Sequence, residues 1–395
     1  MNQIEKLIEE LCPNGVEYKP LGEVAHYVKE KVDASVLTAD NFVGVENLLQ
    51  NKRGKIKTTR GPNTSKVTAY KIGDILLGNI RPYLKKIWLS SNSGGCSGDV
   101  LAIRISDSSS KSLMPEFLFY VLSSDKFFNF NNSHATGGKM PRGNKKKILD
   151  YRVPQPPFRV QQEIVRILDT FQSLEAELEA ELEARRKQYE FYRDQLLTFT
   201  ERERGVRRVT LREIGNVCMC KRILKSQTTP NGDIPFYKIG TFGTTPDSFI
   251  SREIFEEYKS KHPFPKPGSI LISASGTIGR TVEYLGEDAY YQDSNIVWID
   301  NNESLVLNSY LKHWYKTIDW KTDGGTIRRL YNNRLLRTEI SFPLLEEQQR
   351  IVNILDKFDA LVNDLTSGLP AEIEARRKQY EYYRDQLLTF KELAA

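Results

Sequence analysis

Residues that build metal sites and disulfide frameworks are scarce in this sequence. Its 395 residues include four cysteines and four histidines. The cysteines form no Cys-x-x-Cys pair and the histidines are scattered, so neither a zinc site nor a disulfide scaffold is indicated. No apolar run approaches the length of about 18 residues that a membrane span needs, and the N-terminus lacks the apolar stretch of a signal peptide. We therefore expect a cytoplasmic protein without membrane association.

Motifs for nucleotide and methyl-donor chemistry are also lacking. There is no Gly-x-x-x-x-Gly-Lys-[Ser/Thr] loop, so ATP use by this chain is not expected, and there is no glycine-rich strand-to-helix turn for a methyl donor. Gln155 to Phe158 comes close to the Pro-Pro-Tyr/Phe motif of DNA methyltransferases, but its first residue differs and its prolines also suit the start of a helix. Asp247, Glu257 and Lys259 either form a nuclease-type metal site or are ordinary charges in a chain with 27% charged residues.

An internal repeat is what the sequence does contain. Glu183 to Phe199 reappears as Glu374 to Phe390 with a single substitution, at an offset of 191 residues. Upstream, Gln161 to Phe171 matches Gln348 to Phe358 at an offset of 187 residues, so the second copy is longer by four residues between these anchors. Because a repeat of this kind marks a structural unit, the sequence predicts two tandem halves.

The end of each half has the apolar spacing of a long helix. Residues 158–200 carry apolar side chains at steps of three and four, the pattern of a coiled-coil seam. Leu174, Leu178 and Leu182 follow one another at two consecutive steps of four, a stutter that locally unwinds a supercoil. In the second copy, residues 344–395, the sequence Ser-Gly-Leu-Pro should break or kink the helix.

Two globular parts, residues 1–157 and 201–343, precede the helical segments. Short runs of Val, Ile, Leu and Tyr between Gly, Pro, Asn and Ser predict mixed α+β domains with many short strands. The first part carries 23 basic and 15 acidic side chains and the second carries 21 and 17, whereas both helical segments are net acidic. Two basic domains are compatible with polyanion binding and also with simple solubility.

Basic residues cluster next to glycines in both globular parts. Asn51 to Asn63 holds five basic side chains and no acidic one, and further clusters follow Gly137-Gly138 and its counterpart Gly324-Gly325. Glycines let backbone N–H groups approach phosphate, and Arg or Lys can contact phosphates or base edges. The alternative is a set of solvated turns that need a positive φ. The candidate DNA-binding residues in these clusters are Lys52, Arg53, Lys55, Lys57, Arg60, Lys139, Arg142, Lys145, Arg328, Arg329 and Arg334.

The repeat, the order of its parts and the helix EARRKQYEYYRDQLLTF resemble the specificity subunit of type I restriction-modification enzymes. GDILLGNIRPYLKK and GSILISASGTIGR stand at matching places in the two halves. The resemblance covers essentially the whole chain and implies an α+β fold with a pseudo-two-fold tandem repeat, in which two long helices form an antiparallel coiled coil. The expected parts are target recognition domain 1 (1–157), helical spacer 1 (158–200), target recognition domain 2 (201–343) and helical spacer 2 (344–395).

In the family that this chain resembles, each target recognition domain binds one half of a split site in double-stranded DNA. The resemblance implies a chain without a catalytic site of its own and without a bound cofactor. Methyl transfer and cleavage would belong to two modification subunits and to ATP-dependent restriction subunits, which bring S-adenosylmethionine, ATP and Mg²⁺. It also places Arg81, Lys85, Lys86 and Arg280 in loops near the DNA.

The helical spacers have two candidate roles, pairing with each other and docking partner subunits. The tyrosines of the repeated helix suit the core between the two helices, or else a surface for a modification subunit. The candidate spacer and docking residues are Leu174, Leu178, Leu182, Tyr189, Tyr192, Tyr380 and Tyr383.

The leucine stutter lies in a tract in which Leu-Glu-Ala-Glu is written twice and begun a third time. Four helical residues rise about 6 Å and rotate about 400°, so one added unit lengthens the helix and turns its remainder by only about 40°. If this helix spans between the two recognition domains, its length sets the distance between half-sites, because 6 Å is just under two base pairs at about 3.4 Å each. The alternative is a chance low-complexity helix.

Overall fold

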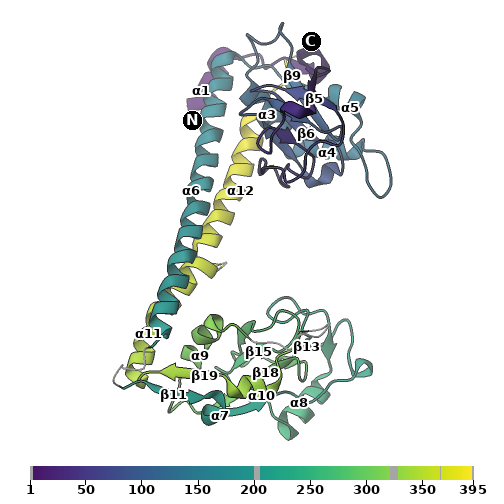
Figure 1. The fold of residues 1–395 in the computed structure, drawn as a ribbon. Coiled ribbons are helices and arrows are strands. Elements are labelled where there is room, and N and C mark those ends of the chain that lie inside the picture. The colour runs from purple at the N-terminus through teal and green to yellow at the C-terminus, as the bar shows by residue number, and fades with distance from the viewer. Residues whose placement is uncertain (1–2, 200–204, 321–327, 365, 394–395) are drawn as a thin grey trace. The chain divides into compact units, whose positions relative to one another are not determined.

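The chain forms two compact units in this computed structural model (Figure 1). Unit 1 consists of Met1–Leu178 and Ile373–Ala395, and unit 2 of Glu179–Glu372. Each unit therefore combines one globular part with a portion of both helical segments. The boundaries that the sequence suggested for four separate segments stay a prediction. The residues that the structure describes are 3–199, 205–320, 328–364 and 366–393.

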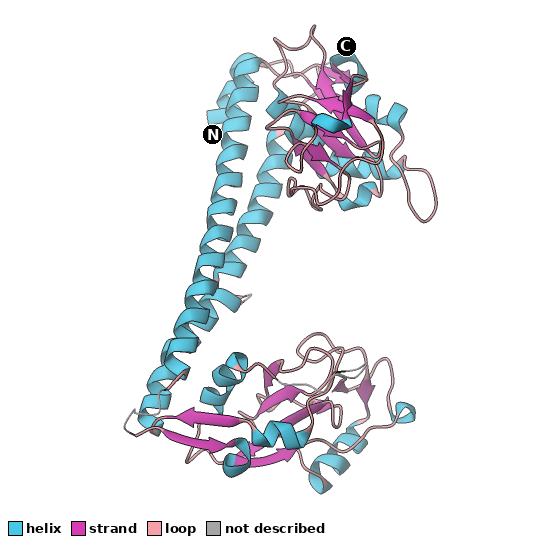
Figure 2. Ribbon diagram, in the orientation of Figure 1, coloured by secondary structure: helices cyan, strands magenta, loops and turns pink. Residues whose placement is uncertain are grey.

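The globular part of unit 1 is built on two four-stranded sheets (Figure 2). Its strands are β1 (Tyr18–Pro20), β2 (Ala25–Tyr27), β3 (Lys31–Asp33), β4 (Phe42–Val43), β5 (Lys66–Tyr70), β6 (Ile75–Gly78), β7 (Ile87–Leu89), β8 (Gly94–Cys96), β9 (Val100–Ile105) and β10 (Arg152–Pro154). The first sheet has the order β2-β9-β6-β7 and is antiparallel. The second has the order β3-β5-β8-β4, and its β4–β8 pair is parallel. β1 and β10 form a separate antiparallel pair.

Unit 2 repeats most of this plan. Its strands are β11 (Arg207–Thr210), β12 (Gly215–Cys218), β13 (Ile234–Tyr237), β14 (Phe249–Ile250), β15 (Ile270–Ser273), β16 (Thr281–Glu283), β17 (Tyr290–Tyr291), β18 (Ile296–Asn301) and β19 (Glu339–Phe342). The sheet β12-β18-β15-β16 corresponds strand for strand to β2-β9-β6-β7, and the pair β11-β19 corresponds to β1-β10. The remaining sheet, β14-β13-β17, has three strands where unit 1 has four.

The helices of the two units correspond only in part. Unit 1 contains α1 (Gln3–Leu11), α2 (Leu21–Val24), α3 (Pro115–Leu122), α4 (Asp125–Ser133), α5 (Lys145–Leu149) and the 3₁₀ helices η1 (Ala34–Val36) and η2 (Pro82–Leu84). Unit 2 contains α7 (Leu211–Ile214), α8 (Arg252–Lys261), α9 (Asn308–Trp314), α10 (Asn332–Arg337), α11 (Leu345–Asn363) and the 3₁₀ helices η3 (Lys225–Gln227) and η4 (Tyr315–Thr317). Two helices contribute residues to both units, α6 (Phe158–Leu197) and α12 (Leu369–Leu387).

The central strand of each main sheet is apolar on both faces. In β6, Ile75 and Leu77 join one apolar core, and Leu76 points to the other. In β15, Ile270 and Leu271 divide in the same way. Successive side chains of a strand point to opposite faces, so a strand with an uninterrupted apolar run packs between two layers. This explains why the apolar run of β6 lies at the centre of unit 1 and that of β15 at the centre of unit 2.

The predicted break in the second helical segment is confirmed. α11 ends at Asn363 and α12 begins at Leu369. A Cβ atom at Gly368 would lie 2.5 Å from the carbonyl oxygen of Ala360, so this close passage of the chain needs a glycine. Pro370 follows inside the first turn of α12, where its missing N–H costs no helical hydrogen bond.

In unit 1, α12 runs alongside the first part of α6 (Figure 1). The ring of Phe171 stacks on that of Tyr383, with centroids 5.7 Å apart, and Glu175 pairs with Arg377 at 2.7 Å. The residue numbers rise along α6 while they fall along α12, so the two helices are antiparallel. In unit 2 the equivalent rings, those of Phe358 and Tyr192, meet at 5.9 Å. The α+β fold, the tandem repeat and the antiparallel pairing are confirmed.

A buried glutamine joins each globular part to its helix. Gln161 of α6 accepts a hydrogen bond from the N–H of Met114 and donates to the carbonyl oxygens of Ser112 and Pro156, at 2.7 to 2.9 Å. Gln348 of α11 makes the same three bonds in unit 2. It accepts from Leu307 N–H and donates to the carbonyl oxygens of Leu305 and Pro343, at 2.8 to 2.9 Å. Both glutamines are completely buried.

Next to this joint the two units differ. In unit 1 the hydroxyl of Tyr120, from α3, donates to Asp169 of α6 at 2.5 Å. In unit 2 the equivalent position on α9 is His313, whose Nε2 lies 2.8 Å from Asp356 of α11 and whose Nδ1 lies 3.3 Å from the hydroxyl of Tyr189. A phenol and an imidazole thus occupy the same place in two otherwise equivalent joints.

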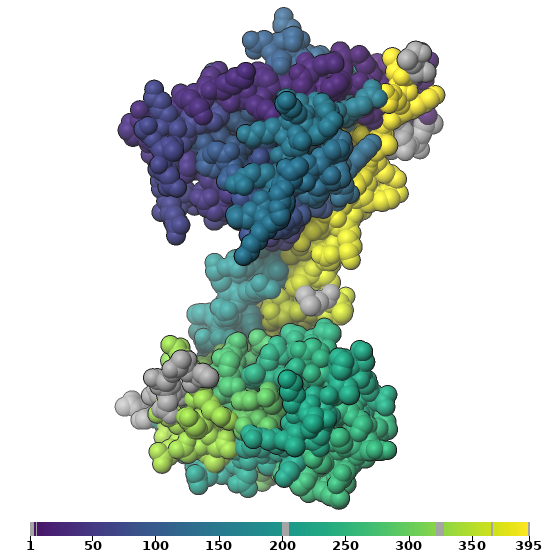
Figure 3. Space-filling model, turned by 90° about the vertical axis from the view of Figure 1, so that its right-hand side faces the viewer, coloured from purple at the N-terminus to yellow at the C-terminus, as the bar shows by residue number. Residues whose placement is uncertain are grey.

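Segments near the two ends of the chain, around Val16 and around Lys391, lie together within unit 1. In Figure 3 the C-terminal residues, in yellow, lie against the N-terminal residues, in purple. Val16 N–H donates to the carbonyl oxygen of Lys391 at 2.8 Å, and Leu393 N–H donates to that of Val16 at 3.0 Å. A backbone ladder therefore joins the end of the second repeat to the beginning of the first.

Candidate nucleic-acid interface

In each unit a basic segment crosses the end of the central sheet. Beyond β6, Ile80 forms an isolated antiparallel bridge with Arg142, and beyond β15, Ser275 forms one with Arg329. Arg142 and Arg329 are equivalent in the repeat, at an offset of 187 residues. The two halves therefore bring an arginine to the same point of the sheet, and we call these two residues the bridging arginines.

Both bridging arginines are held by the loop that precedes the neighbouring strand. Arg142 Nε lies 3.1 Å from a carboxylate oxygen of Asp99, just before β9. Arg329 Nη2 donates to the carbonyl oxygen of Ser294, just before β18, at 3.0 Å. Ser294 has a φ of 51°, which a residue other than glycine adopts when its surroundings hold it there.

A short helix follows each bridging arginine. Asn144 caps α5, since its side-chain oxygen accepts hydrogen bonds from the N–H groups of Lys146 and Lys147. Lys145 and Lys146 are exposed, and so are Asn332 and Asn333 at the equivalent positions of α10. Lysine amines suit phosphate or guanine, whereas asparagine amides suit the edge of adenine. The same surface thus carries different hydrogen-bonding groups in the two units.

An open depression of about 700 Å³ lies beside α10 in unit 2. Three arginines contribute to it together with polar and apolar groups, and the described residues that line it include no carboxylate. Its lining residues are Met219, Ser294, Arg329, Leu330, Tyr331, Asn332, Asn333, Arg334 and Arg337. A concave surface with this charge can hold an anionic backbone and offers donors to base edges.

In unit 1 two turns pair beside the segment that carries Arg142. The N–H groups of Asn51 and Lys52 donate to the carbonyl oxygens of Leu84 and Lys85, at 3.0 and 2.9 Å. We call residues 51–53 and 81–85 the paired turns. Arg53 lies on the first of them and is exposed, as are Lys57 and Arg60 further along the loop. The start of the basic cluster Asn51 to Asn63 is therefore part of a two-turn element.

The other basic residues predicted in the first loop have specific surroundings. Lys55 donates to the carbonyl oxygen of Asp40 at 2.7 Å and lies 4.9 Å from the ring centroid of Trp88. Burial lowers the pKa of Lys55. Lys57 pairs with the carboxylate of Asp40 at 2.9 Å. Whether these side chains contact DNA stays a prediction.

The remaining predicted residues divide between exposed positions and internal contacts. Lys86 donates to the carbonyl oxygen of Val45 at 2.7 Å, and Arg280 to that of Phe242 at 2.8 Å. Arg81 is half-buried, and its N–H donates to the carbonyl oxygen of Pro141 at 2.7 Å. Exposed positions are those of Lys139, Arg142, Lys145, Arg328 and Arg334. Gly137 has a φ of 102°, as a turn requires, and its predicted counterparts Gly324 and Gly325 lie outside the described residues.

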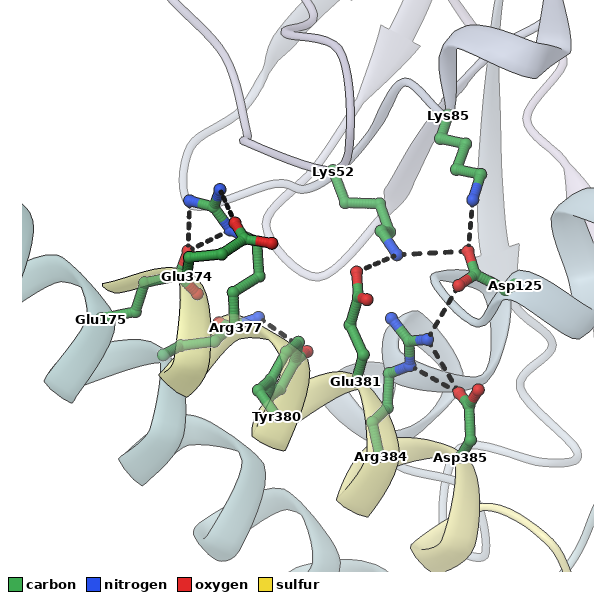
Figure 4. Close-up of polar contacts among 11 residues, drawn as sticks. Lys52, Lys85, Asp125, Glu175, Glu374, Arg377, Tyr380, Glu381, Arg384 and Asp385 are labelled. Atoms are coloured by element: carbon green, nitrogen blue, oxygen red, sulfur yellow. Dashed lines mark hydrogen bonds and ion pairs between the residues drawn. The ribbon is translucent and has the colours of Figure 1, made fainter. Parts of the chain in front are cut away.

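Lys52 and Lys85 point inward, toward Asp125 of α4 (Figure 4). Their amines lie 3.4 and 2.6 Å from the same carboxylate oxygen, and Arg384 of α12 lies 3.5 Å from the other one. Burial alone would raise the pKa of Asp125, but the hydrogen bond from Lys85 and the charges of Lys52 and Arg384 outweigh it and bring the pKa to about 2. Burial and the charge of Arg384 lower the pKa of Lys52.

Comparison with known proteins assigns the family. The chain matches the type I restriction modification DNA specificity domain twice, over residues 13–184 and 203–375. The chain belongs to this specificity-domain family. A protein of Haemophilus influenzae named as a putative type I restriction enzyme specificity subunit, S.HindORF215P, is 44% identical over 98% of both chains. The EcoR124I/EcoR124II specificity subunit of Escherichia coli is 38% identical over 60% of this chain and 61% of that protein.

Solved structures share the fold of this specificity-domain protein. A chain from a study of complex assembly and conformational transition of the type I R-M system has a TM-score of 0.62 and 21% identity, and the match covers 95% of this chain and 98% of that one. The S subunit of the type I restriction-modification system of M. genitalium has a TM-score of 0.55 and 14% identity, over 95% and 96%.

The spacer residues of this specificity-domain chain have unequal surroundings. Tyr189 is buried against His313, and Tyr380 is partly buried against α6. Tyr192 and Tyr383 are more exposed, each packed on a phenylalanine of the opposite helix. Leu182 packs on the core of unit 2, Leu178 is half-buried and Leu174 is 45% exposed. The tyrosine face thus serves helix pairing in part and leaves apolar area exposed.

The enzyme patterns of the sequence do not converge in this specificity-domain protein. Asp247 pairs with Lys238 at 2.8 Å, Glu257 pairs with Lys261 one turn along α8 at 3.0 Å, and Lys259 lies 4.8 Å from the ring of Phe255. The side chain of Gln155 donates to nearby backbone carbonyls of its own segment, and α6 begins directly after Pro157.

Metal-binding clusters and membrane spans are both absent from the described residues. In that part of the chain no group of three or more His, Cys, Asp or Glu side chains could hold a metal ion. No helix there is both long and apolar enough to cross a membrane.

Four residues of the interface escaped sequence reasoning. Tyr83, in η2, is 53% exposed on the paired turns. Asn79 and Asn131 are buried next to β6, and among the described residues their side-chain oxygens have no hydrogen-bond partner, which is rare for buried amides. Asp125 shares its site with residues 40 to 259 positions away in the chain. Asn79 lies between the apolar run of β6 and Arg81, and this position was the sequence signal by which it could have been found.

Proposed function

We propose that this chain is the DNA-recognition subunit of a type I restriction-modification complex and that each unit reads one half of a bipartite site. The observation that carries the proposal is the duplicated interface, a bridging arginine and a short polar helix at the same end of equivalent sheets. Two similar surfaces with different exposed side chains suit two half-sites of different sequence. The recognition domains would be residues 1–157 and 201–343.

The proposed DNA contacts are the accessible basic side chains around the bridging arginines. In a backbone-and-base interface, such residues neutralise phosphates and fix the register, while neighbouring amides and arginines read base edges. The residues assigned to this role are Arg53, Arg60, Lys139, Arg142, Lys145, Arg328, Arg329 and Arg334. Lys55, Lys57, Lys86, Arg81 and Arg280 would support the loops that carry them.

Catalysis would belong to partner chains in the cytoplasm. Modification subunits would supply methyl transfer with S-adenosylmethionine, and restriction subunits would supply ATP- and Mg²⁺-dependent translocation and cleavage. The proposal of two modification subunits rests on a duplicated surface. Phe191 and Tyr192 form an exposed ring pair with centroids 5.5 Å apart, and Tyr382 and Tyr383 form the equivalent pair, also at 5.5 Å.

Exchange of one domain tests the proposed function. Residues 1–150 are replaced by the equivalent domain of another specificity subunit, and the methylated sequences are mapped in a host that carries the partner subunits. We expect one half of the methylated site to change while the other half stays. The reciprocal exchange of residues 201–343 is the matched control and should change the other half. If either exchange altered both halves, the two-reader model would be wrong.

A further inference from the structure

The paired turns of unit 1 store unusual backbone strain. Among the residues that the structure describes, five that are not glycine have a positive φ, and four of these lie in the paired turns. They are Asn51, Lys52, Arg81 and Lys85, with φ between 49° and 64°. Such conformations persist where surrounding contacts hold them, and they gather at functional sites.

Asp125 is the contact that holds both turns at once. Lys52 comes from the first turn and Lys85 from the second, and both amines lie on the same carboxylate oxygen. The three side chains are between 14% and 32% exposed, so solvent weakens these ion pairs less than at an open surface. The carboxylate thus fixes the distance between the two turns in addition to their two backbone hydrogen bonds.

The anchor continues into the repeated helix α12. Arg384, whose side chain is completely buried, lies between Asp125 and Asp385, and Glu381 approaches Lys52 at 3.9 Å (Figure 4). The equivalent arginine of unit 2, Arg193, pairs with the adjacent Asp194 at 2.7 Å. Among the residues that the structure describes, the link between a loop and the helix through a shared aspartate therefore occurs in unit 1.

Unit 2 reaches the same backbone shape by other means. The segment after β15 has its positive φ values at Gly276 (65°) and Gly279 (80°), near the positions that correspond to Arg81 and Lys85. Glycine adopts this conformation without steric cost, so no anchor is required. In unit 1 the corresponding residues are the cations Arg81 and Lys85, and the internal carboxylate of Asp125 pairs with Lys85.

From this geometry we propose that Asp125 is a positioning residue for DNA recognition. It holds the paired turns so that Arg53 and Tyr83, which both lie on them, contact the first half-site, while Lys52 and Lys85 serve as the anchor and leave phosphate contacts to their neighbours. The inference rests on the proposed function of unit 1 as a DNA reader.

The sign of the effect distinguishes positioning from simple electrostatics. Asp125→Asn removes a negative charge from a basic domain, and long-range electrostatics alone would raise the affinity for any DNA. If Asp125 positions the turns, the variant instead loses discrimination of the first half-site. Asp107→Asn is the matched control, because it removes the same charge from an exposed turn after β9.

The test uses the full chain assembled with its modification subunits. The probes are three duplexes: the sequence methylated by the wild-type complex, the same sequence altered in the first half, and the same sequence altered in the second half. Discrimination of each half is the Kd for the duplex altered in that half divided by the Kd for the unaltered duplex. For Asp125→Asn we expect this ratio to fall about tenfold for the first half, equivalent to about 1.4 kcal/mol, and to stay unchanged for the second half. Asp107→Asn should change neither ratio, and Asp125→Glu should recover part of the loss.

Other results would overturn the proposal. If all three Kd values shifted equally in Asp125→Asn and Asp107→Asn, Asp125 would act only through its charge. If the Kd ratios of Asp125→Asn were unchanged, Asp125 would not position the turns. If Asp125→Asn unfolds, Lys85→Gln tests the same anchor, with Lys111→Gln as the matched control. Unchanged discrimination of the first half-site in Lys85→Gln would contradict the positioning role. A wild-type complex that discriminates neither half would refute the proposed function itself, and with it this inference.

Discussion

Unit 1 and unit 2 attach different globular parts to helical segments of similar sequence. Gln161 and Gln348 make the same three hydrogen bonds, and all of their partners are backbone N–H and C=O groups. A joint that recognises backbone atoms does not depend on the side chains of the domain that it holds. This comparison gives a physical reason why one helical repeat can carry two domains of different sequence.

The side chains around the joint show where the two units are free to differ. Tyr120 in unit 1 and His313 in unit 2 occupy the same position, each bonded to the equivalent aspartate of its helix. The turns at the other end of the sheet differ as well, with cations and an internal carboxylate in unit 1 and with glycines in unit 2. The scaffold is therefore repeated, while the adjacent chemistry is specific to each unit.

The largest expected effect comes from changing the length of α6, which contributes to both units. Two residues inserted between Leu174 and Ala184 rotate the rest of the helix by about 200°, and we expect binding to be lost. One inserted Leu-Glu-Ala-Glu unit rotates it by only about 40° and adds about 6 Å, so both half-site sequences should remain and the unread spacer should lengthen by one or two base pairs. Methylation mapping measures both variants, and an unchanged spacer after the four-residue insertion would show that the tract does not set the spacing.

The glutamine joints should be equally important in the two units. Gln161→Leu and Gln348→Leu each leave buried backbone groups without partners, and we expect each variant to lose about 3 kcal/mol of unfolding free energy in its own unit. The neighbours Gln162 and Gln349 are exposed, so Gln162→Leu and Gln349→Leu are matched controls with little expected loss. Urea unfolding measures the four variants. A loss confined to one unit would break the equivalence of the joints.

Unit 2 has His313 at the position where unit 1 has Tyr120. We expect this histidine to make the stability of unit 2 sensitive to pH. Burial lowers the pKa of His313, although the hydrogen bond to Asp356 opposes this effect. As pH falls below about 6.5, the unfolded chain therefore binds the proton first. Stability that is present above this pH is lost as pH falls toward the lowered pKa, by about 1.4 kcal/mol for each pH unit between the unfolded and folded pKa values.

The variant His313→Tyr gives unit 2 the side chain of unit 1 and tests this expectation. Its unfolding free energy should vary less than that of the wild type between pH 7 and 5, in thermal unfolding at matched ionic strength. Tyr120→Phe serves as the control in unit 1 and should leave the pH dependence of unit 2 as it is. An identical pH profile in wild type and His313→Tyr would contradict the assigned pKa direction.

The smallest expected effect concerns salt. Neutralising Lys52, Arg53 and Lys55 together should flatten the dependence of DNA affinity on salt, and most of this change should come from Arg53, because the two lysines have internal partners. One lost phosphate contact changes the slope by about 0.9. Arg328→Gln should have a similar effect through unit 2. An unaltered slope in the triple variant would remove the first loop from the proposed interface.

Local sequence patterns were enough to predict the repeat, the long helix and the central strands of this protein. The offset repeat predicted two halves, the apolar spacing predicted the long helix, and Ser-Gly-Leu-Pro predicted its break before Leu369. The apolar runs around Ile75 and Ile270 marked the central strands. Each of these features depends on residues that are close in sequence, or on a direct copy of them, so a single chain reveals it.

Tertiary structure alone decided which charges meet. Lys52 and Lys85 read as members of basic clusters, but both point at Asp125, and Arg384 reaches the same carboxylate from 259 residues away. The division of each helical segment between two units arises in the same way, since a helix pattern states which face is apolar and leaves open what covers it. Coulomb attraction and packing depend on distance in space, and the folded chain sets that distance.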